Sequence, residues 1–175
     1  PEISYSTSSN GNVFVEDHIQ KNLVHGYYAC VSFIDAQIGK IVDKLSQTGV
    51  IENTIIVIWG DHGYHLGDHS VWNKHTVLEQ ATRAPLLIYD PSLKKSQKIS
   101  TPTESIDVFP TLLDLAGLEK LDSLDGTSLE NSMIKGKSNK KYAVSQFNMF
   151  RGKNLMAYAF RTKEHRYIMI INKLK

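Results

Sequence analysis

The stretch Thr54-Ile-Ile-Val-Ile-Trp-Gly-Asp-His-Gly-Tyr-His-Leu-Gly-Asp-His69 organises the interpretation of the whole chain. Residues 54–59 are a continuous, largely β-branched apolar run, which predicts a strand covered on both faces in a parallel sheet. The run stops at Gly60, and Asp61 and His62 follow at its carboxyl end, where open α/β sheets bind their ligands. A carboxylate beside an imidazole can face one metal ion or one anion.

The loop after this strand adds a cation, because Lys74 follows His62 by twelve residues. A bound cation on one side and an ammonium on the other suit a transferring sulfuryl or phosphoryl group. Simpler readings stay open: Asp61 could cap a helix, His62 could be a hydrogen-bonded loop residue, and Lys74 could be solvated. Tyr64 and Trp72 are equally compatible with pocket walls and with loop anchors, and structural roles are favoured for His65, His69 and His75.

The flanking segments predict an α/β architecture: the C-terminal part of a mostly parallel sheet with flanking helices, followed by a small antiparallel sheet. We assign residues 1–130 to the first part and residues 131–175 to the second. Apolar residues at spacings of three and four predict a helix over 17–47, ended by Gly49. The other expected elements are a strand at 84–89, helices at 105–117 and 129–137, and strands at 142–147, 155–161 and 167–171.

Composition narrows the function classes. The formal net charge of +2 on 175 residues is too close to balance to argue for nucleic acid as a partner. No apolar run approaches the ~18 residues of a membrane span. Cys30 is the only cysteine, so no internal disulfide can form, and its place in the helical pattern predicts a small buried residue.

Several segments in a fixed order resemble the sulfatase family of the alkaline phosphatase superfamily, and most closely its iduronate-2-sulfatase group. They are the stretch quoted above, Tyr28-Ala-Cys-Val-Ser-Phe-Ile-Asp-Ala-Gln-Ile-Gly-Lys-Ile-Val-Asp-Lys-Leu45, Trp72-Asn-Lys-His-Thr76, Ala81-Thr-Arg-Ala-Pro-Leu-Leu-Ile88 and Asp107-Val-Phe-Pro-Thr-Leu-Leu-Asp-Leu-Ala-Gly117. The resemblance is strong over residues 27–90 and absent over 131–150.

The resemblance implies roles for three residues. Asp61 and His62 would be ligands of a divalent cation, usually Ca²⁺ in sulfatases, and His62 would also act on the ester. Lys74 would contact the sulfate group. Tyr64 is a further candidate for substrate binding, from its place in the loop and not from the resemblance. The family's nucleophile is a formylglycine made from the cysteine of a Cys-x-Pro-Ser-Arg motif, its usual substrates in this group are sulfated glycans or small sulfate esters, and its members are secreted, periplasmic or lysosomal.

Two departures limit what this chain does by itself. It contains no Cys-x-Pro-Ser-Arg motif, because Cys30 is followed by Val-Ser-Phe, and it lacks the family's N-terminal aspartate pair. We therefore expect the C-terminal part of a sulfatase, packed against a missing N-terminal part and inactive alone. A phosphomonoester or phosphonate hydrolase or a phosphotransferase of the same superfamily, and a non-catalytic binding fragment, are the alternatives.

Overall fold

The computed structural model describes residues 15–93, 95–136, 140–149 and 154–172. Its longest element is α1 (Asp17–Gln47), which confirms the predicted helix and ends before Gly49, where φ is +71°. The apolar stripe of α1 is not buried, however: Val31, Ile34 and Ile41 are each more than half exposed. Among the described helices, none is both long and apolar enough to cross a membrane.

The predicted strand after α1 is present but is not part of a parallel sheet. A short 3-10 turn, η1 (Ile51–Asn53), leads into β1 (Ile56–Trp59), which pairs antiparallel with β4 (Leu86–Tyr89). The intervening chain turns back on itself, so Trp59 lies opposite Leu86, and the N–H of Gly60 donates to the Pro85 carbonyl at 3.0 Å. Within the described residues every sheet is antiparallel, so the parallel sheet expected from the apolar run is wrong for this chain.

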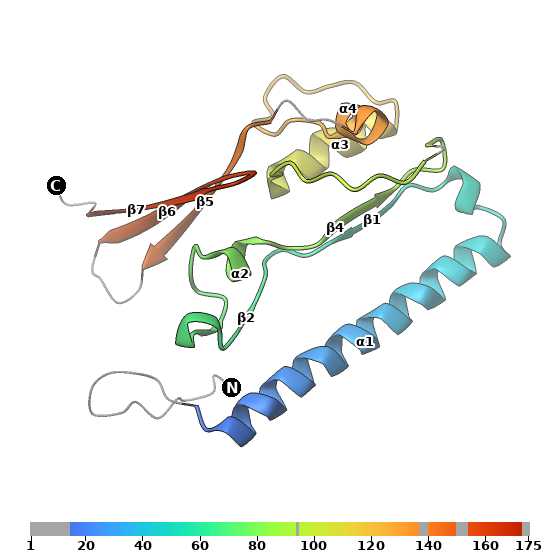
Figure 1. The fold of residues 1–175 in the computed structure, drawn as a ribbon. Coiled ribbons are helices and arrows are strands. Elements are labelled where there is room, and N and C mark those ends of the chain that lie inside the picture. The colour runs from blue at the N-terminus through green and yellow to red at the C-terminus, as the bar shows by residue number, and fades with distance from the viewer. Residues whose placement is uncertain (1–14, 94, 137–139, 150–153, 173–175) are drawn as a thin grey trace.

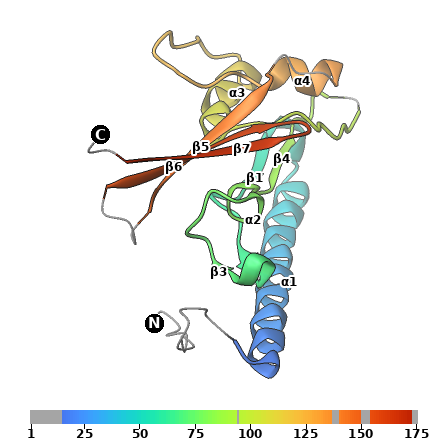
Figure 2. The ribbon, with the colours of Figure 1, turned by 60° about the vertical axis from the view of Figure 1, so that its left-hand side comes forward.

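The apolar composition of residues 54–59 misled the prediction of pairing because it reports burial and not strand direction. One face of the β1–β4 pair is open, since Leu87 is 57% exposed and Tyr89, which points to the same face, is 41% exposed. Figures 1 and 2 show the pair lying between α1 on one side and the C-terminal strands on the other.

Small elements fill the connection between β1 and β4. They are β2 (His65–Leu66), η2 (Asp68–Ser70), β3 (Trp72–Asn73) and α2 (Glu79–Thr82), with β2 and β3 forming a two-stranded hairpin. At the tip of this hairpin Gly67 has φ +106°, and the Trp72 ring packs against it. A glycine is needed there because a side chain would be strained and would crowd the indole.

The segment after β4 forms η3 (Ser105–Asp107), α3 (Val108–Leu115) and α4 (Glu130–Lys135). The fully buried Asp107 holds these pieces together: its carboxylate accepts hydrogen bonds from the backbone N–H groups of Glu104 and Thr127, both at 2.8 Å. Lys140 Nζ lies 2.5 Å from Asp107 Oδ2 and 2.6 Å from Glu104 Oε2. Burial alone would lower the pKa of Lys140, but the two carboxylates outweigh it and raise that pKa.

The three C-terminal strands form the predicted antiparallel meander. These strands, β5 (Tyr142–Met149), β6 (Leu155–Thr162) and β7 (Arg166–Asn172), are called the C-terminal sheet below. Its inner face builds a small core in which Val77 packs against Ala157 and Ala159, with Phe147 and Ile168 around them. The C-terminal sheet therefore covers the segment that follows Lys74. The assigned boundary at residue 130 falls at the first residue of α4 and stays a prediction.

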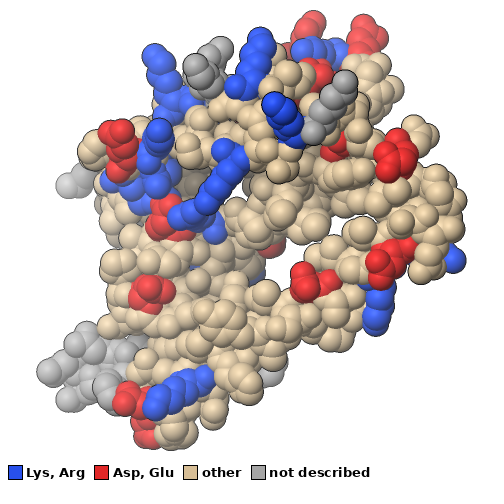
Figure 3. All heavy atoms as spheres, turned by 45° about the vertical axis from the view of Figure 1, so that its right-hand side comes forward, with Lys and Arg blue, Asp and Glu red and all other residues tan. Residues whose placement is uncertain are grey.

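Two surface features complete the description. Cys30 is exposed on α1, so its assignment as a buried residue is wrong, because this face of the helix has no neighbouring element among the described residues. Figure 3 shows acidic and basic side chains interspersed over one face, with most of the basic ones in its upper half. This mixed distribution agrees with the small net charge.

Candidate functional site

The turn that follows β1 is held tightly against α2. The N–H of Gly63 donates to the Ala81 carbonyl at 2.8 Å. A Cβ atom at position 63 would overlap the Gln80 carbonyl oxygen, so only glycine allows the two backbones to approach this closely. Asp61 and His62 therefore project from a turn whose position depends on α2.

The hydrogen bonds of His62 define its tautomer. Nδ1 lies 2.8 Å from the Gly63 carbonyl oxygen, which can only accept, so Nδ1 carries the proton and donates it. Nε2 then presents a lone pair, and Lys74 Nζ donates to it at 2.6 Å. A backbone carbonyl that fixes the ring in this way is typical of a histidine whose other nitrogen binds a metal.

The structure brings three of the four predicted site residues together, and we call Asp61, His62 and Lys74 the candidate site. Asp61 Oδ2 lies 3.5 Å from His62 Nε2, and the Asp61 side chain is 77% exposed. A carboxylate oxygen and a nitrogen lone pair can both bind a cation, and in this structure the Lys74 ammonium donates to the lone pair of His62. The group can therefore hold positive charge and, through the exposed ammonium, an anion.

The donor set fits part of a divalent-cation site. Two ligands about 2.4 Å from one Ca²⁺ and at right angles lie about 3.4 Å apart, close to the separation seen between Asp61 and His62. Ca²⁺ needs six to eight ligands, mostly oxygens. No group of three or more His, Cys, Asp or Glu side chains that could hold a metal occurs in the described part of the chain. Asp61 and His62 would hold such an ion only together with further donors.

The fourth predicted residue, Tyr64, turns away to α1. Its ring lies 5.6 Å from the ring of Tyr27, with an interplanar angle of 31°. Trp72 lines a shallow hollow with Leu66 and the first turns of α1, including His25 and Tyr28. The Tyr64 ring thus lies against α1, and Trp72 borders a hollow that it shares with α1, while the roles of both residues stay predictions.

Two other histidines of the loop, His65 and His75, have structural surroundings, whereas His69 is exposed. His65 is fully buried, and its Nε2 lies 2.8 Å from Thr76 Oγ1. His75 stacks on Phe147 of the C-terminal sheet, with ring centroids 5.9 Å apart. Arg83, a loop residue whose charge could tie the loop to the body of the protein, is 78% exposed, and its Nη1 lies 4.0 Å from Glu79 Oε1.

His65 should make the stability of the protein depend on pH. Burial lowers its pKa below the ordinary value of about 6.5, although the Asp68 carboxylate acts in the opposite direction. The unfolded chain then binds more protons below pH 6.5, so the free energy of unfolding should fall as the pH drops, by at most about 1.4 kcal/mol per pH unit. Urea denaturation between pH 7.5 and 5 measures this slope.

Two substitutions isolate the contribution of His65. The variant His65→Gln should lose most of the slope between pH 6.5 and 5.5, while His165→Gln, in the exposed turn after β6, should keep it. An unchanged slope in His65→Gln would contradict the assignment.

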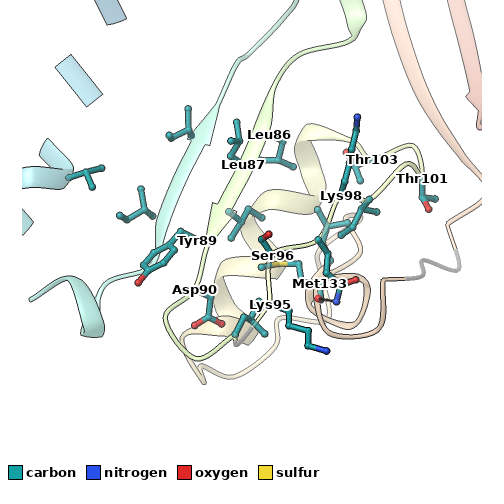
Figure 4. A pocket seen from close by; sticks show the side chains of 18 of the residues that line it. Leu86, Leu87, Tyr89, Asp90, Lys95, Ser96, Lys98, Thr101, Thr103 and Met133 are labelled. Atoms are coloured by element: carbon teal, nitrogen blue, oxygen red, sulfur yellow. Dashed lines mark hydrogen bonds between the residues drawn. The ribbon is translucent and has the colours of Figure 1, made fainter. Parts of the chain in front are cut away.

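A larger cavity of about 840 Å³ lies beside the β1–β4 pair (Figure 4). Its walls include Ile56 and Ile58 of β1, Leu86 and Ile88 of β4, and Met133 of α4. None of the three candidate-site residues is among the described residues that line it. The cavity is therefore separate from the turn that carries Asp61 and His62.

Comparison with known proteins identifies the family. Residues 4–118 match the sulfatase family, and residues 67–175 match the C-terminal region of N-sulphoglucosamine sulphohydrolase. The chain belongs to the sulfatase family.

Curated relatives of this sulfatase-family chain come from bacteria and animals. A sulfatase of Formosa agariphila is 40% identical over 149 residues, covering 85% of this chain and 28% of the relative. Arylsulfatase K of Bos taurus is 32% identical over 175 residues, covering 94% of this chain and 32% of the relative. The chain thus spans about a third of the length of the curated relatives it matches.

Solved structures show the same fold. A 2-O GAG sulfatase superposes with a TM-score of 0.81 at 21% identity, covering 93% of this chain and 37% of that protein. A protein solved with its substrate D-glucosamine-2-N,6-O-disulfate gives 0.63 at 26% identity, with coverages of 81% and 32%. The phosphonate monoester hydrolase of Silicibacter pomeroyi gives 0.63 at 28% identity, with coverages of 81% and 33%.

These similarities confirm the sulfatase family and a partial, mixed α/β sulfatase fold. They do not single out the iduronate-2-sulfatase group, because arylsulfatase K is among the relatives that match. The narrower resemblance drawn from residues 28–45 and 53–69 is thus not supported.

Sequence reasoning missed the group that joins the loop to the C-terminal sheet. Glu79 of α2 binds both Arg161 of β6 and Arg166 of β7, which are 82 and 87 residues away along the chain. No local pattern connects residues at such separations. These two arginines tie the loop to the C-terminal sheet.

Proposed function

We propose that the complete protein containing this chain hydrolyses sulfate esters and that Asp61, His62 and Lys74 form this chain's part of the active site. The observation that carries the proposal is the convergence of Lys74 Nζ on His62 Nε2, at 2.6 Å, beside the Asp61 carboxylate at the end of β1. Membership of the sulfatase family supports sulfate-ester hydrolysis as the reaction of this arrangement.

Each residue has a distinct task in this proposal. Lys74 binds a sulfate oxygen and stabilises the negative charge that grows as the ester bond breaks. Asp61 and His62 hold a divalent cation, with Ca²⁺ as the family's usual ion, which would polarise the sulfuryl group. The proton that Nδ1 donates to the Gly63 carbonyl keeps the Nε2 lone pair directed at the site.

The nucleophile lies outside this chain. Cys30 lacks the Pro-Ser-Arg sequence that formylglycine formation requires in the family, and it lies on the exposed face of α1. The formylglycine would supply the attacking oxygen from the remainder of the protein. That remainder, we further propose, packs on the exposed apolar stripe of α1 and on the open side of the β1–β4 pair.

Sulfated glycans are the proposed substrate class. The solved relative that is 26% identical binds D-glucosamine-2-N,6-O-disulfate, a sulfated amino sugar. An exposed ammonium also suits a polar, anionic ester better than an apolar one, because it attracts the negative charge of the ester.

A second candidate is hydrolysis of phosphonate monoesters. It is favoured by one observation, the 28% identity to the phosphonate monoester hydrolase of Silicibacter pomeroyi. The same lysine and cation would stabilise a phosphoryl group equally well, so Asp61, His62 and Lys74 cannot distinguish the two reactions.

The test is turnover by the complete protein. We expect release of sulfate from 4-nitrocatechol sulfate and from glucosamine sulfates, loss of activity after removal of divalent cations with EDTA, and recovery on adding Ca²⁺. Hydrolysis of phenyl phosphonate monoesters without release of sulfate would replace the proposal by the second candidate. Activity that survives EDTA would contradict the roles of Asp61 and His62.

A further inference from the structure

The candidate site has two parts, Lys74 and the Asp61–His62 turn, and both depend on one short segment. This segment, residues 77–83, lies between β3 and β4 and includes α2. Lys74 lies just before the segment, and the Asp61–His62 turn is hydrogen-bonded to it. We propose that Glu79, bound by Arg161 and Arg166, is a positioning residue that fixes this segment on the C-terminal sheet and thereby sets the places of Lys74 and of the Asp61–His62 turn. The inference rests on the proposed function.

The contacts of Glu79 are extensive for a residue that is only partly buried. Its Oε2 accepts hydrogen bonds from Arg161 Nε at 2.8 Å and from Arg166 Nη2 at 2.5 Å and Nε at 3.2 Å. The Arg161 hydrogen bond, together with Arg166, lowers the pKa of Glu79 in spite of its burial. Two arginines on neighbouring strands thus hold one carboxylate in a fixed place.

One of these arginines, Arg166, also reaches the backbone of the segment. Arg166 Nη1 donates to the Val77 carbonyl at 2.7 Å, and the side chain of Val77 is buried against Ala157 and Ala159. Residues 77 and 79 are therefore both attached to the C-terminal sheet. Two attachment points on a segment of this length fix its orientation as well as its position.

One connection runs from this segment to Lys74. Thr76 Oγ1 accepts the N–H of Leu78 at 3.1 Å and lies 2.8 Å from Nε2 of the buried His65. The N–H of Thr76 donates to the Lys74 carbonyl at 2.8 Å. A displacement of residue 77 would therefore pass to the backbone of Lys74 through a short hydrogen-bonded path.

The other connection runs to the Asp61–His62 turn. The Ala81 carbonyl accepts the N–H of Gly63, and the turn lies so close to Gln80 that no side chain fits at position 63. A rotation of α2 would move this turn and change the distance between His62 Nε2 and Lys74 Nζ. Displacements of about 1 Å in catalytic groups can cost about 100-fold in rate.

A cluster that only stabilises the fold would behave differently. Its loss would lower the melting temperature in proportion to the contacts removed but leave the geometry of the surviving folded molecules unchanged. The positioning role predicts a change at the candidate site itself in fully folded protein.

The experiment uses the complete protein with ¹⁵N-labelled histidine. We expect Glu79→Gln to shift the His62 ring-nitrogen resonances and to lower kcat/KM for sulfate-ester hydrolysis by about 10- to 100-fold at a temperature where the variant is folded. The matched control is Glu164→Gln, an exposed glutamate in the turn between β6 and β7, which should change neither. Arg166→Lys keeps the positive charge, so its kcat/KM should lie between those of the wild type and of Glu79→Gln. It serves as the test variant if Glu79→Gln does not fold.

The outcomes separate the two proposals. If the wild-type protein releases no sulfate, the proposed function fails, and the His62 resonances still test the positioning role. If the variants lower the melting temperature but leave both the His62 resonances and kcat/KM unchanged, the positioning role is overturned and the cluster is structural.

Discussion

Replacing Lys74 with alanine is expected to lower kcat for sulfate-ester hydrolysis by the complete protein by about 100- to 1,000-fold. Lys74 Nζ lies 2.6 Å from His62 Nε2 on an exposed part of the loop, where it can meet a sulfate oxygen. An ammonium placed where negative charge develops stabilises the transition state more than the bound substrate, so kcat should change more than KM. Steady-state kinetics with an aryl sulfate measure both.

The control for this prediction is Lys163→Ala in the turn between β6 and β7, which removes an equally exposed lysine and should leave kcat unchanged. The melting temperature of Lys74→Ala should stay close to that of the wild type, because an exposed side chain contributes little to folding. A Lys74→Ala enzyme with more than half of the wild-type kcat would remove Lys74 from the active site.

Replacing Asp107 with alanine is expected to lower the free energy of unfolding by about 3–5 kcal/mol. The change removes one carboxylate bound to Lys140 and the acceptor of the Glu104 and Thr127 N–H groups in a fully buried place. Breaking a buried ion pair from one side is costly because the remaining charge cannot return to water. Urea denaturation followed by tryptophan fluorescence measures the loss.

Asp122→Ala, at an exposed aspartate between α3 and α4, is the matched control and should change the stability by no more than about 0.5 kcal/mol. Asp107→Asn keeps one acceptor oxygen, so its loss of unfolding free energy should lie between those of Asp107→Ala and Asp122→Ala. A loss below about 1 kcal/mol in Asp107→Ala would contradict the stabilising role of Asp107.

Local periodicity predicted the elements of this chain well. The three- and four-residue spacing of apolar side chains indicated α1 to its ends, and short polar turns between alternating runs indicated the antiparallel order of β5, β6 and β7. The Asp-His-Gly sequence after a strand indicated the turn of the candidate site, and the structure places Lys74 Nζ 2.6 Å from His62 Nε2, while the roles of these residues stay predictions.

Features that depend on distant parts of the chain could not be predicted in the same way. The direction of β4 relative to β1 follows from the path of the intervening loop, and the exposure of Cys30 follows from what packs on α1. The Glu79–Arg166 and Asp107–Lys140 pairs join residues 87 and 33 positions apart, and no spacing rule connects them. Sequence patterns indicate local conformation and burial, whereas these contacts depend on the tertiary arrangement.

The antiparallel pairing of β1 with β4 has a consequence for how this region can vary. The Gly60–Pro85 hydrogen bond closes the base of one long loop, residues 61–84, between β1 and β4. This loop carries all the candidate-site residues. The entropic cost of closing a loop grows only slowly with its length. Its tip, where His69 and Ser70 have positive φ values, can therefore lengthen or shorten among related proteins while the base stays in register, so specificity can diversify at the tip without disturbing the site.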